Sequence, residues 1–462
     1  MRRADQAAIS SGTPAEVLME RAGRALARAA IRLAGGRYGR RVLVLCGKGN
    51  NGGDGLVAAR VLRREGLSVR VVRLFEDDDV PDPAHFDVVV DAIFGTGFKG
   101  EPEGRVAAAI NALAGHERVV SADIPSGVNG ATGAAGGVAV RAAVTVAMGA
   151  EKLGTALSPG AAYAGRVTVA DIGIPIPPPA AHLAEDDDVR RVLPRRPPDA
   201  HKRSGGSVAV LAGSEATKGA ALLCCRGAGR MGSGYVTLGS TRSVLAAATI
   251  PMPEILTTPV TFDDVLGPDV LGAFAPVLER AGCLAIGPGL GTGDDQRALV
   301  RRVLREVDLP VVLDADALNV LDAGGLVERA ASTVMTPHPA ELGRVLGVGT
   351  DEVVADRLAA ARNAAERLGC VVLAKGHRTV VTDGRRAVVV PTGGPQLATA
   401  GTGDVLTGAV AALLSAGVDS FDAAWCAAYV HGVAGELAAP GALAWDVAEA
   451  LGTARSRFTL DA

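Results

Sequence analysis

The sequence has few aromatic residues and no excess of positive charge. Eight Phe, two Trp and four Tyr make up 3% of its 462 residues, and the formal net charge is −3. A protein that binds nucleic acid usually combines a basic surface with rings that stack on bases. The composition therefore argues against a dedicated nucleic-acid binder.

The sequence also lacks long apolar runs and paired cysteines. No uncharged apolar stretch reaches the ~18 residues of a membrane span, and no apolar core follows Arg2 and Arg3 to form a secretion signal. Its six Cys are scattered without a CxxC pair, which is typical of buried thiols in a reducing compartment. We expect a cytoplasmic protein that does not contact membranes.

Glycine, in contrast, is abundant, with 60 Gly and 25 Pro. The chain is longer than one domain of ~100–200 residues, so more than one domain is expected. The stretch 174–188 contains three consecutive Pro, which exclude a helix or a central strand. We predict two domains, 1–178 and 182–462, joined by a Pro-rich linker at 174–188.

Short runs of Val, Ile and Leu alternate with helical stretches in both halves. We predict strands in the first half at 42–46, 69–74, 87–94, 118–124, 144–148 and 166–173. In the second half we predict strands at 207–213, 283–287, 309–316, 332–337 and 370–376, a hairpin of 379–383 and 387–393, and helices at 219–231, 294–305, 351–368 and 404–415. This alternation predicts parallel sheets covered on both faces. The first domain is expected to be Rossmann-like and doubly wound, and the second a larger α/β domain.

A glycine-rich loop, GKGNNGGDG at 47–55, follows the first predicted strand. Five Gly in nine positions let the backbone approach a ligand closely. The helix that starts there directs free N–H groups outward, which favours an anion such as a pyrophosphate. The loop does not have the GxGxxG spacing of NAD-dependent oxidoreductases, which counts against that class.

Oxygen-bearing side chains follow three neighbouring strands of the first domain. They are Asn51, Asp91, Asp123 and Ser126. Ligands bind beyond the carboxyl ends of parallel strands, so we expect these side chains to share one crevice. Hard oxygen donors suit an alkali or alkaline-earth cation rather than zinc.

The motifs GNNGGDG, VDAIFGTG and ADIPSG, in this order, resemble the NAD(P)H-hydrate epimerase family over residues 5–175. The resemblance implies potassium held by Asn51, Asp91 and Ser126. It implies that the hydrated dinucleotide contacts Asp123 and two loops: Asn50, Asn51, Gly52, Gly53 and Asp54, and Gly95, Thr96, Gly97, Phe98, Lys99, Gly100 and Glu101. It also leads us to expect a homo-oligomer.

Asp123 is our candidate for catalysis in the first domain. In a hydrated NADH or NADPH the ring nitrogen can expel the neighbouring hydroxyl, and re-addition on the other face inverts the centre. One carboxylate that transfers a proton reversibly suffices for this chemistry.

The strongest motif of the second domain is ATAGTGDVLTG at 398–408. Gly401 and Gly403 form a turn whose N–H groups open a helix, which predicts an anion site for a transferring phosphoryl group. Asp404, in the first turn of that helix, is placed to accept a proton from a substrate hydroxyl. The chain has no GxxxxGK[ST], so it is not a P-loop enzyme.

This motif resembles the ribokinase-like kinases, and the second domain as a whole resembles the ADP/ATP-dependent NAD(P)H-hydrate dehydratases over residues 185–455. IGPGLG, VVLDADALN, TPHPAE and AKGHRTVV appear in the family's order. The resemblance implies that the hydrated cofactor contacts Ala220, Gly289, His338 and Asp404. It implies that ADP or ATP contacts Lys375, Gly376, His377, Arg378, Thr379, Gly401 and Gly403, and that Asp314 and Asn319 support the site through Mg²⁺.

The sequence thus indicates a bifunctional repair enzyme that epimerises the R and S hydrates and dehydrates the S form with ADP or ATP. Two alternatives stay open for its parts. The second domain could be a vitamin or sugar kinase that releases a phosphorylated product, and the first could be a non-catalytic nucleotide-binding module.

Overall fold

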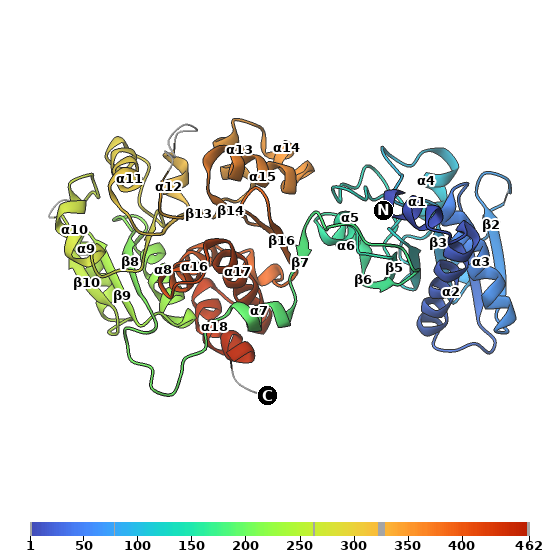
Figure 1. Cartoon of the computed structure of the whole chain (residues 1–462), viewed down its shortest axis with the longest axis horizontal. Coiled ribbons are helices and arrows are strands. Elements are labelled where there is room, and N and C mark those ends of the chain that lie inside the picture. The colour runs from blue at the N-terminus through green and yellow to red at the C-terminus, as the bar shows by residue number, and fades with distance from the viewer. Residues whose placement is uncertain (1, 78, 262–263, 322–328, 460–462) are drawn as a thin grey trace. The chain divides into compact units, whose positions relative to one another are not determined.

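The computed structural model describes the whole chain except residues 1, 78, 262–263, 322–328 and 460–462. It divides into two compact units, Met1–Ala180 and Ala181–Ala462, which are coloured blue to teal and green to red in Figure 1. Each unit is built around its own sheet.

The first unit contains a six-stranded parallel sheet in the order β2-β1-β3-β4-β5-β6. Its strands are β1 (Arg41–Cys46), β2 (Ser68–Arg73), β3 (Val88–Ala92), β4 (Val119–Ala122), β5 (Val144–Met148) and β6 (Arg166–Ala170). The strand order reverses between β1 and β3, and in sheets of this kind ligands bind at such a reversal.

Helices cover both faces of this sheet. Helices α2 (Ala15–Ala34) and α3 (Asn50–Arg64) pack on one face against Val42 and Val44, and α4 (Gly104–Ala112) packs on the other against Leu43 and Leu45. The remaining elements of the unit are α1 (Arg2–Ser10), η1 (Pro83–His85), α5 (Leu153–Ala156) and α6 (Ala161–Ala164). The predicted doubly wound fold is confirmed.

The second unit contains a ten-stranded sheet in the order β10-β9-β8-β11-β12-β13-β14-β15-β16-β7, in which only the β14-β15 and β15-β16 pairs are antiparallel. Its strands are β7 (His182–Leu183), β8 (Ser207–Leu211), β9 (Tyr235–Ser240), β10 (Leu256–Pro259), β11 (Cys283–Ile286), β12 (Val311–Leu313), β13 (Thr333–Met335), β14 (Val371–Ala374), β15 (Thr379–Thr382) and β16 (Ala387–Val390). The pair β15 and β16 forms the predicted hairpin.

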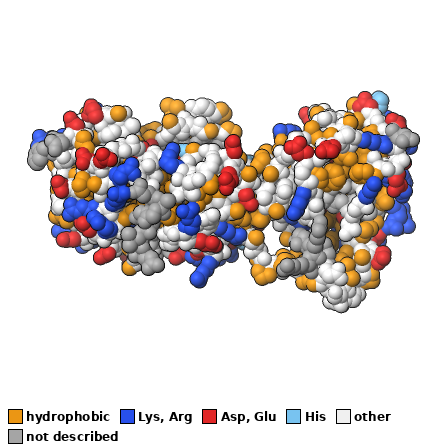
Figure 2. Space-filling view, turned by 90° about the horizontal axis from the view of Figure 1, so that it is seen from above, with side chains coloured by type: hydrophobic (Ala, Val, Ile, Leu, Met, Phe, Trp, Pro, Cys, Tyr) orange, Lys and Arg blue, Asp and Glu red, His pale blue; other side chains and the backbone are white. Residues whose placement is uncertain are grey.

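Four helices of the second unit supply most of the helical residues of the hydrophobic cluster that packs against this sheet: α8 (Lys218–Met231), α16 (Thr402–Ser415), α17 (Ser420–Leu437) and α18 (Ala444–Thr459). The others are α7 (Asp186–Val192), α9 (Arg242–Thr249), α10 (Val270–Leu278), α11 (Asp294–Glu306), α12 (Asp316–Asn319), α13 (Pro339–Leu346), α14 (Thr350–Ala355), α15 (Arg357–Leu368) and η2 (Pro395–Leu397). Figure 2 shows acidic and basic side chains interspersed over the visible face, as the small net charge leads one to expect.

Three expectations are corrected by the structure. The second half of the predicted linker is not a linker, because β7 pairs with β16 and α7 follows it directly. The helix predicted at 351–368 is interrupted at Asp356, which has a non-helical backbone and caps α15 by accepting from the Ala359 N–H. The strands β9 and β10 were not predicted, because Thr237 and Ser240 interrupt the apolar run of β9 and β10 is a partly exposed edge strand.

Candidate active sites

A cavity of about 620 Å³ opens at the carboxyl ends of the strands of the first unit, at the reversal between β1 and β3. The lining includes these predicted contact residues: Asn50, Asn51, Asp54, Gly95, Thr96, Gly97, Phe98, Lys99 and Asp123. Gly52, Gly53, Gly100 and Glu101 are not part of the lining. A Cβ at Gly53 would lie 2.6 Å from the Met19 Cε atom, so this glycine serves the packing of α3 against α2.

The three residues predicted to hold a cation form one hydrogen-bonded cluster beside this cavity. Ser126 Oγ donates to Asp91 Oδ1 at 2.6 Å and accepts from the Phe94 N–H at 2.9 Å. Asn51 Nδ2 donates to the carbonyls of Phe94 and Ala122 at 2.6 and 2.8 Å, so its amide is held in a fixed orientation with Oδ1 beside Gly95. The prediction that these three residues converge is therefore met in the structure, while their binding of a cation stays a prediction.

Asp91 is completely buried, and all its hydrogen-bond donors among the described residues are neutral. Besides Ser126 Oγ, its carboxylate accepts from Ser121 Oγ at 2.8 Å and from the Ser126 N–H at 2.9 Å. Burial raises the pKa of Asp91, and the hydrogen bonds from Ser126 and Ser121 oppose the rise. A bound cation would stabilise the ionised form of such a carboxylate.

Asp123 stands directly after β4 with an unusual backbone conformation. Its φ is 66°, and the Ile124 N–H donates to the Ala122 carbonyl at 2.8 Å, which closes a tight turn centred on Asp123. A left-handed backbone is uncommon for a residue other than Gly and is found most often at functional sites. The turn directs a 7% exposed carboxylate into the lining of the cavity.

Lys152, which follows β5, is the partner of Asp123. Its Nζ forms a short ion pair with Asp123 Oδ1 and donates to the Met148 carbonyl at 2.7 Å. Asp123 Oδ1 also accepts from the Met148 N–H at 3.0 Å. Both side chains are buried. Lys152 was not among the predicted site residues, although it follows the end of a predicted strand in the same way as they do.

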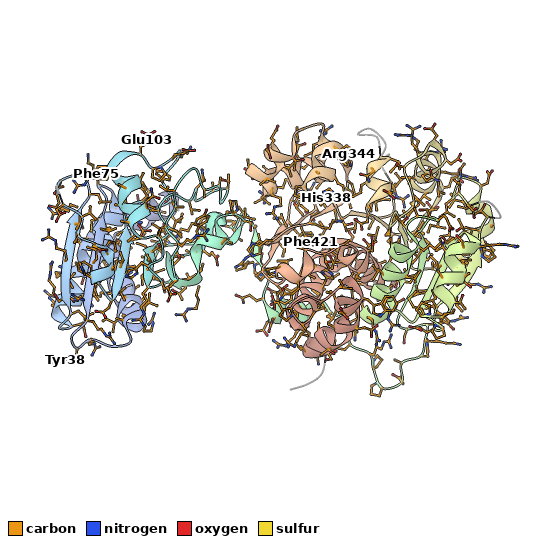
Figure 3. All side chains as sticks on the ribbon, turned by 180° about the vertical axis from the view of Figure 1, so that it is seen from behind. Tyr38, Phe75, Glu103, His338, Arg344 and Phe421 are labelled. Carbon is orange, nitrogen blue, oxygen red and sulfur yellow. The ribbon has the colours of Figure 1, made fainter. Side chains whose placement is uncertain are left out.

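Three of the chain's few aromatic rings lie at this cavity. The rings of Phe94 and Phe98 stack with centroids 4.3 Å apart, and Lys48 Nζ lies 4.6 Å from the ring of Phe75. Phe75 is 43% exposed and lies at the surface of the first unit (Figure 3). Stacked rings and a nearby cation suit a ligand with flat rings and phosphates.

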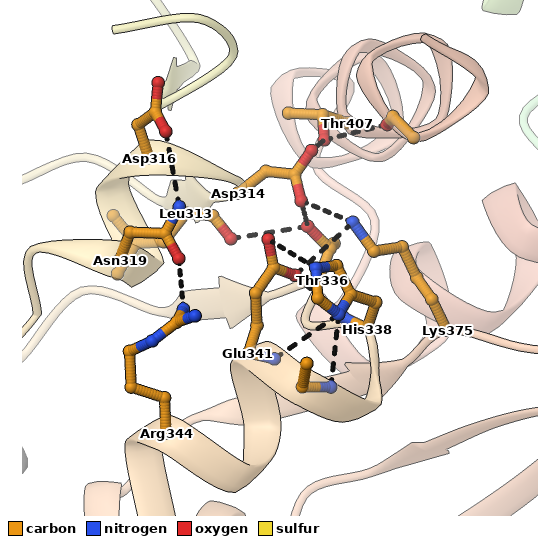
Figure 4. A network of polar contacts seen from close by, with 12 residues as sticks. Leu313, Asp314, Asp316, Asn319, Thr336, His338, Glu341, Arg344, Lys375 and Thr407 are labelled. Atoms are coloured by element: carbon orange, nitrogen blue, oxygen red, sulfur yellow. Dashed lines mark hydrogen bonds and ion pairs between the residues drawn. The ribbon is translucent and has the colours of Figure 1, made fainter. Parts of the chain in front are cut away.

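The second site is organised around Asp314, a buried carboxylate after β12 (Figure 4). Its Oδ1 accepts from Lys375 Nζ at 2.8 Å and from Thr336 Oγ1 at 2.7 Å, and its Oδ2 accepts from Thr407 Oγ1 at 2.7 Å. These donors follow β14 and β13 or lie in the second turn of α16. The contacts therefore join the ends of three parallel strands to the helix of the glycine-rich motif.

Asp404 lies in the first turn of α16, beside this network. Burial and the nearby Asp314 raise its pKa to about 7, while Lys375 opposes the rise. A carboxylate with such a pKa is a stronger base than an ordinary one, and about half of it is ionised at neutral pH. Asp404 is therefore suited to remove a proton from a hydroxyl.

The turn before Asp404 has the form expected of an anion site. Gly401 has φ 93° and stands at the N-cap of α16, where no side chain caps the helix. A Cβ at Gly403 would lie 3.3 Å from Lys375 Nζ, so the second glycine leaves room for the ammonium group. The turn thus presents backbone N–H groups next to a lysine.

His338 and Glu341 form a capping box at the start of α13 (Figure 4). His338 Nδ1 accepts from the N–H groups of Ala340 and Glu341, and Glu341 Oε2 accepts from the His338 N–H at 2.8 Å. Burial raises the pKa of Glu341, and Lys375 Nζ lies 3.9 Å from its Oε2. Although the His338 ring also has this capping role, its side chain is 49% exposed.

The other predicted residues of the second domain fall into separate groups. Thr217 Oγ1 donates to the Gly289 carbonyl at 2.8 Å, and the Ala220 N–H donates to the Thr217 carbonyl, so Ala220 and Gly289 both contact Thr217. Asn319 donates to Asp316 at 3.3 Å and accepts from Arg344, and it shares no described hydrogen-bond partner with Asp314. The residues Lys375 to Arg378 form the turn between β14 and β15, and Thr379 begins β15.

Thr336, Glu341 and Thr407 were not predicted as site residues. All three lie inside the motifs TPHPAE and ATAGTGDVLTG. Their position, after a strand or one helical turn beyond a glycine turn, would not distinguish them from capping residues.

Two α/β units, each with a buried carboxylate directed into a site at the ends of its strands, define a two-site enzyme. A family model described as NAD(P)H-hydrate dehydratase matches residues 208–453, and one described as YjeF-related protein N-terminus matches residues 15–85 and 73–154. The bifunctional NAD(P)H-hydrate repair enzyme Nnr of Moorella thermoacetica is 39% identical over 92% of this chain and 88% of its own length. The chain belongs to the family of bifunctional NAD(P)H-hydrate repair enzymes.

Solved structures of similar proteins support the same family for the second unit. The ADP/ATP-dependent NAD(P)H-hydrate dehydratase of Bacillus subtilis, co-crystallised with ATP and Mg²⁺, is 30% identical and matches 60% of this chain and 99% of its own, with a TM-score of 0.53. A ribokinase-like superfamily protein of Enterococcus faecalis, 22% identical over 62% of this chain with a TM-score of 0.53, confirms the ribokinase-like fold. No helix among the described residues is long and apolar enough to cross a membrane.

Proposed function

We propose that the first unit interconverts the R and S forms of hydrated NADH and NADPH, and that the second unit dehydrates the S form with ADP or ATP. Family membership over nearly the whole chain supports this function. The observation that carries it is the presence of two separate carboxylate sites, Asp123 with Lys152 and Asp404 with Lys375.

For epimerisation, the ring nitrogen of the hydrate expels the hydroxyl, which leaves as water after it takes a proton. Lys152 and Asp123 together hold one mobile proton at the cavity, and water that re-adds to the opposite face returns it. The proton count is unchanged over the cycle. Lys152 also directs the Asp123 carboxylate through its own bond to the Met148 carbonyl.

The donor set beside this cavity fits a potassium ion. All its side-chain ligands would be oxygens: Asn51 Oδ1, the Asp91 carboxylate and Ser126 Oγ. Asp91 is buried and forms no ion pair with any described residue, so a cation would stabilise its negative charge. When bound, the ion would supply positive charge near the diphosphate of the substrate.

For dehydration, we propose that Asp404 removes the proton of the ring hydroxyl. The hydroxyl oxygen then bonds to the terminal phosphoryl group of ADP or ATP, and the bond to the departing AMP or ADP breaks. The N–H groups at Gly401 and Gly403 stabilise the negative charge of the phosphoryl group during its transfer. Phosphate then leaves the ring carbon with help from the ring nitrogen, and loss of a proton from the neighbouring carbon restores NADH or NADPH.

The acidic residues around Asp404 fit a magnesium ion carried by the nucleotide. Asp314, Asp316 and Glu341 all contribute to the raised pKa of Asp404, so the site has more negative charge than Lys375 compensates. Mg²⁺ is commonly bound by one or two carboxylates together with substrate phosphates. When bound, it would neutralise charge on the transferring phosphoryl group.

We also propose that the enzyme acts in the cytoplasm. Its six cysteines are buried and form no disulfide, as expected in a reducing compartment.

The experiment that tests the function is a time course of the purified chain with a mixture of R and S hydrates, ADP or ATP, Mg²⁺ and K⁺, followed by HPLC. Full conversion to NADH or NADPH is expected. A halt with the R form left over would show that only the dehydratase works. A stable phosphorylated product in place of NADH would show that the second unit is a kinase.

A further inference from the structure

Arg357, the first residue of α15, is a buried cation outside the catalytic network. The break at Asp356 ends α14 and starts α15 at this point. The Arg357 side chain lies against the turn between β14 and β15, and the residue is 8% exposed. Arginine is seldom buried to this extent without a carboxylate partner.

Among the residues that the structure describes, no carboxylate pairs with Arg357. None of the ion pairs among the described residues involves it, and its Nε atom has no hydrogen-bond partner. Burial alone lowers its pKa, without an opposing contribution from an acidic group. The positive charge of Arg357 is therefore uncompensated in the ligand-free protein.

The turn beside Arg357 is shaped around its guanidinium group. Arg357 Nη1 donates to the His377 carbonyl at 3.0 Å. A Cβ at Gly376 would lie only 2.5 Å from the same Nη1 atom, and Gly376 has φ 147°, so a side chain there would displace the guanidinium. Thr379 Oγ1 donates to the Gly376 carbonyl at 2.9 Å and closes the turn from the other side.

This turn and the first residue of β15 contain residues that we propose to contact the nucleotide, from Lys375 to Thr379. The phosphates of ADP or ATP would supply the negatively charged partner that Arg357 does not have among the described residues. They would lie close to the backbone that Arg357 holds. A screened surface arginine could not act in this way, because solvent would weaken its field.

We propose that Arg357 is a positioning residue for the nucleotide. It fixes the backbone of Gly376 and His377 through the His377 carbonyl, and its buried charge favours the polyphosphate. This inference rests on the proposed nucleotide-dependent dehydration.

The test compares Arg357→Met and Arg357→Lys with Arg367→Met, a control on the exposed side of the same helix. We expect Arg357→Met to raise the KM for ADP with Mg²⁺ by about tenfold or more. The KM for the S hydrate and the kcat at saturating ADP should change by less than about twofold. Arg357→Lys should recover part of the affinity because it restores the charge, and Arg367→Met should match the wild type.

A second measurement separates positioning from folding. ADP with Mg²⁺ should raise the melting temperature of the wild type and of Arg367→Met, and the increase should be much smaller for Arg357→Met. Arg357→Met could melt at a lower temperature than the wild type but keep the wild-type KM for ADP and the wild-type increase in melting temperature with ADP. In that case Arg357 is only structural and the inference is wrong. If Arg357→Met does not fold, the same comparison with Arg357→Lys and Gly376→Ala decides, because both alter the contact at Nη1.

The two proposals fail differently. If the wild type produces no NADH from the S hydrate with either ADP or ATP, the proposed function is wrong. If the wild type does so and the Arg357 variants retain its nucleotide KM, only the inference about Arg357 is wrong.

Discussion

Lys152 forms an ion pair with Asp123 across 29 residues of sequence, and both side chains are buried at the cavity of the first unit. The pair joins the ends of β4 and β5. Because Lys152 also donates to the Met148 carbonyl, it holds the carboxylate in one place while leaving it in the lining of the cavity. The role of Lys152 in epimerisation can therefore be tested in the same way as the role of Asp123.

Asp123→Asn and Lys152→Met should each slow epimerisation by about 10²-fold or more, since general acid–base catalysis contributes ~10²–10⁴-fold. Dehydration of the S hydrate should stay at the wild-type rate, because the second site is separate. HPLC of the R and S forms without nucleotide measures the first reaction. Asp79→Asn, an exposed change in the same unit, is the control. Wild-type epimerisation in Asp123→Asn would refute its assignment.

Asp404→Asn should lose dehydration by about 10²-fold or more while it still epimerises. In the wild type, the rate at low substrate should rise with pH and level off above about 7, because only the ionised carboxylate accepts the proton and its pKa is about 7 in the ligand-free protein. The pH profile of kcat/KM for the S hydrate checks this expectation. A rate that is flat from pH 5 to 8 would contradict the role of Asp404 as the base.

The same pKa predicts an effect on stability. A carboxyl group whose pKa is raised by folding stabilises the native state below its unfolded pKa of about 3.8, and that contribution is lost as the pH rises through about 7. Asp404→Asn should therefore melt a few degrees higher than the wild type at pH 8 and show little difference near pH 4. Calorimetry at both pH values measures this, with the exposed Asp351→Asn as control. Equal melting temperatures at pH 8 would contradict the prediction.

Lys375→Met should remove more than catalysis. It leaves Asp314, which is 1% exposed, without its charged partner, and breaking a buried ion pair in this way costs about 3–5 kcal/mol. We expect loss of dehydration and a lower melting temperature of the second unit, with epimerisation intact. Arg385→Met, on the exposed hairpin, should change neither. Thermal unfolding measures the melting temperature, and the HPLC assay measures the two reactions.

Removal of cations should separate the two reactions. Chelation of Mg²⁺ should stop dehydration and leave epimerisation, whereas replacement of K⁺ by a large organic cation should slow epimerisation alone. Ser126→Ala should mimic the second treatment, because it removes an oxygen ligand and the hydrogen bond to Asp91. Epimerisation that is indifferent to K⁺ would remove the support for a potassium site.

The sequence alone was sufficient for most of the fold and for the central carboxylates. Apolar strand patterns located all six strands of the first sheet, because strands buried on both faces have continuous Val and Ile runs. The rule that ligands bind at strand ends then selected Asp91 and Asp123. Asp404 was found because two glycines precede it at the start of a helix.

The tertiary structure decided which groups accompany those carboxylates. Lys152 lies 29 residues from Asp123, and Thr407 and Lys375 lie 93 and 61 residues from Asp314. Residue spacing predicts contacts within one helix or strand, but partners so far apart meet only through the order of the strands and the packing of helices on them. For the same reason, the sequence determined that the chain has two sites with acidic residues, and only the fold showed that a lysine completes each of them.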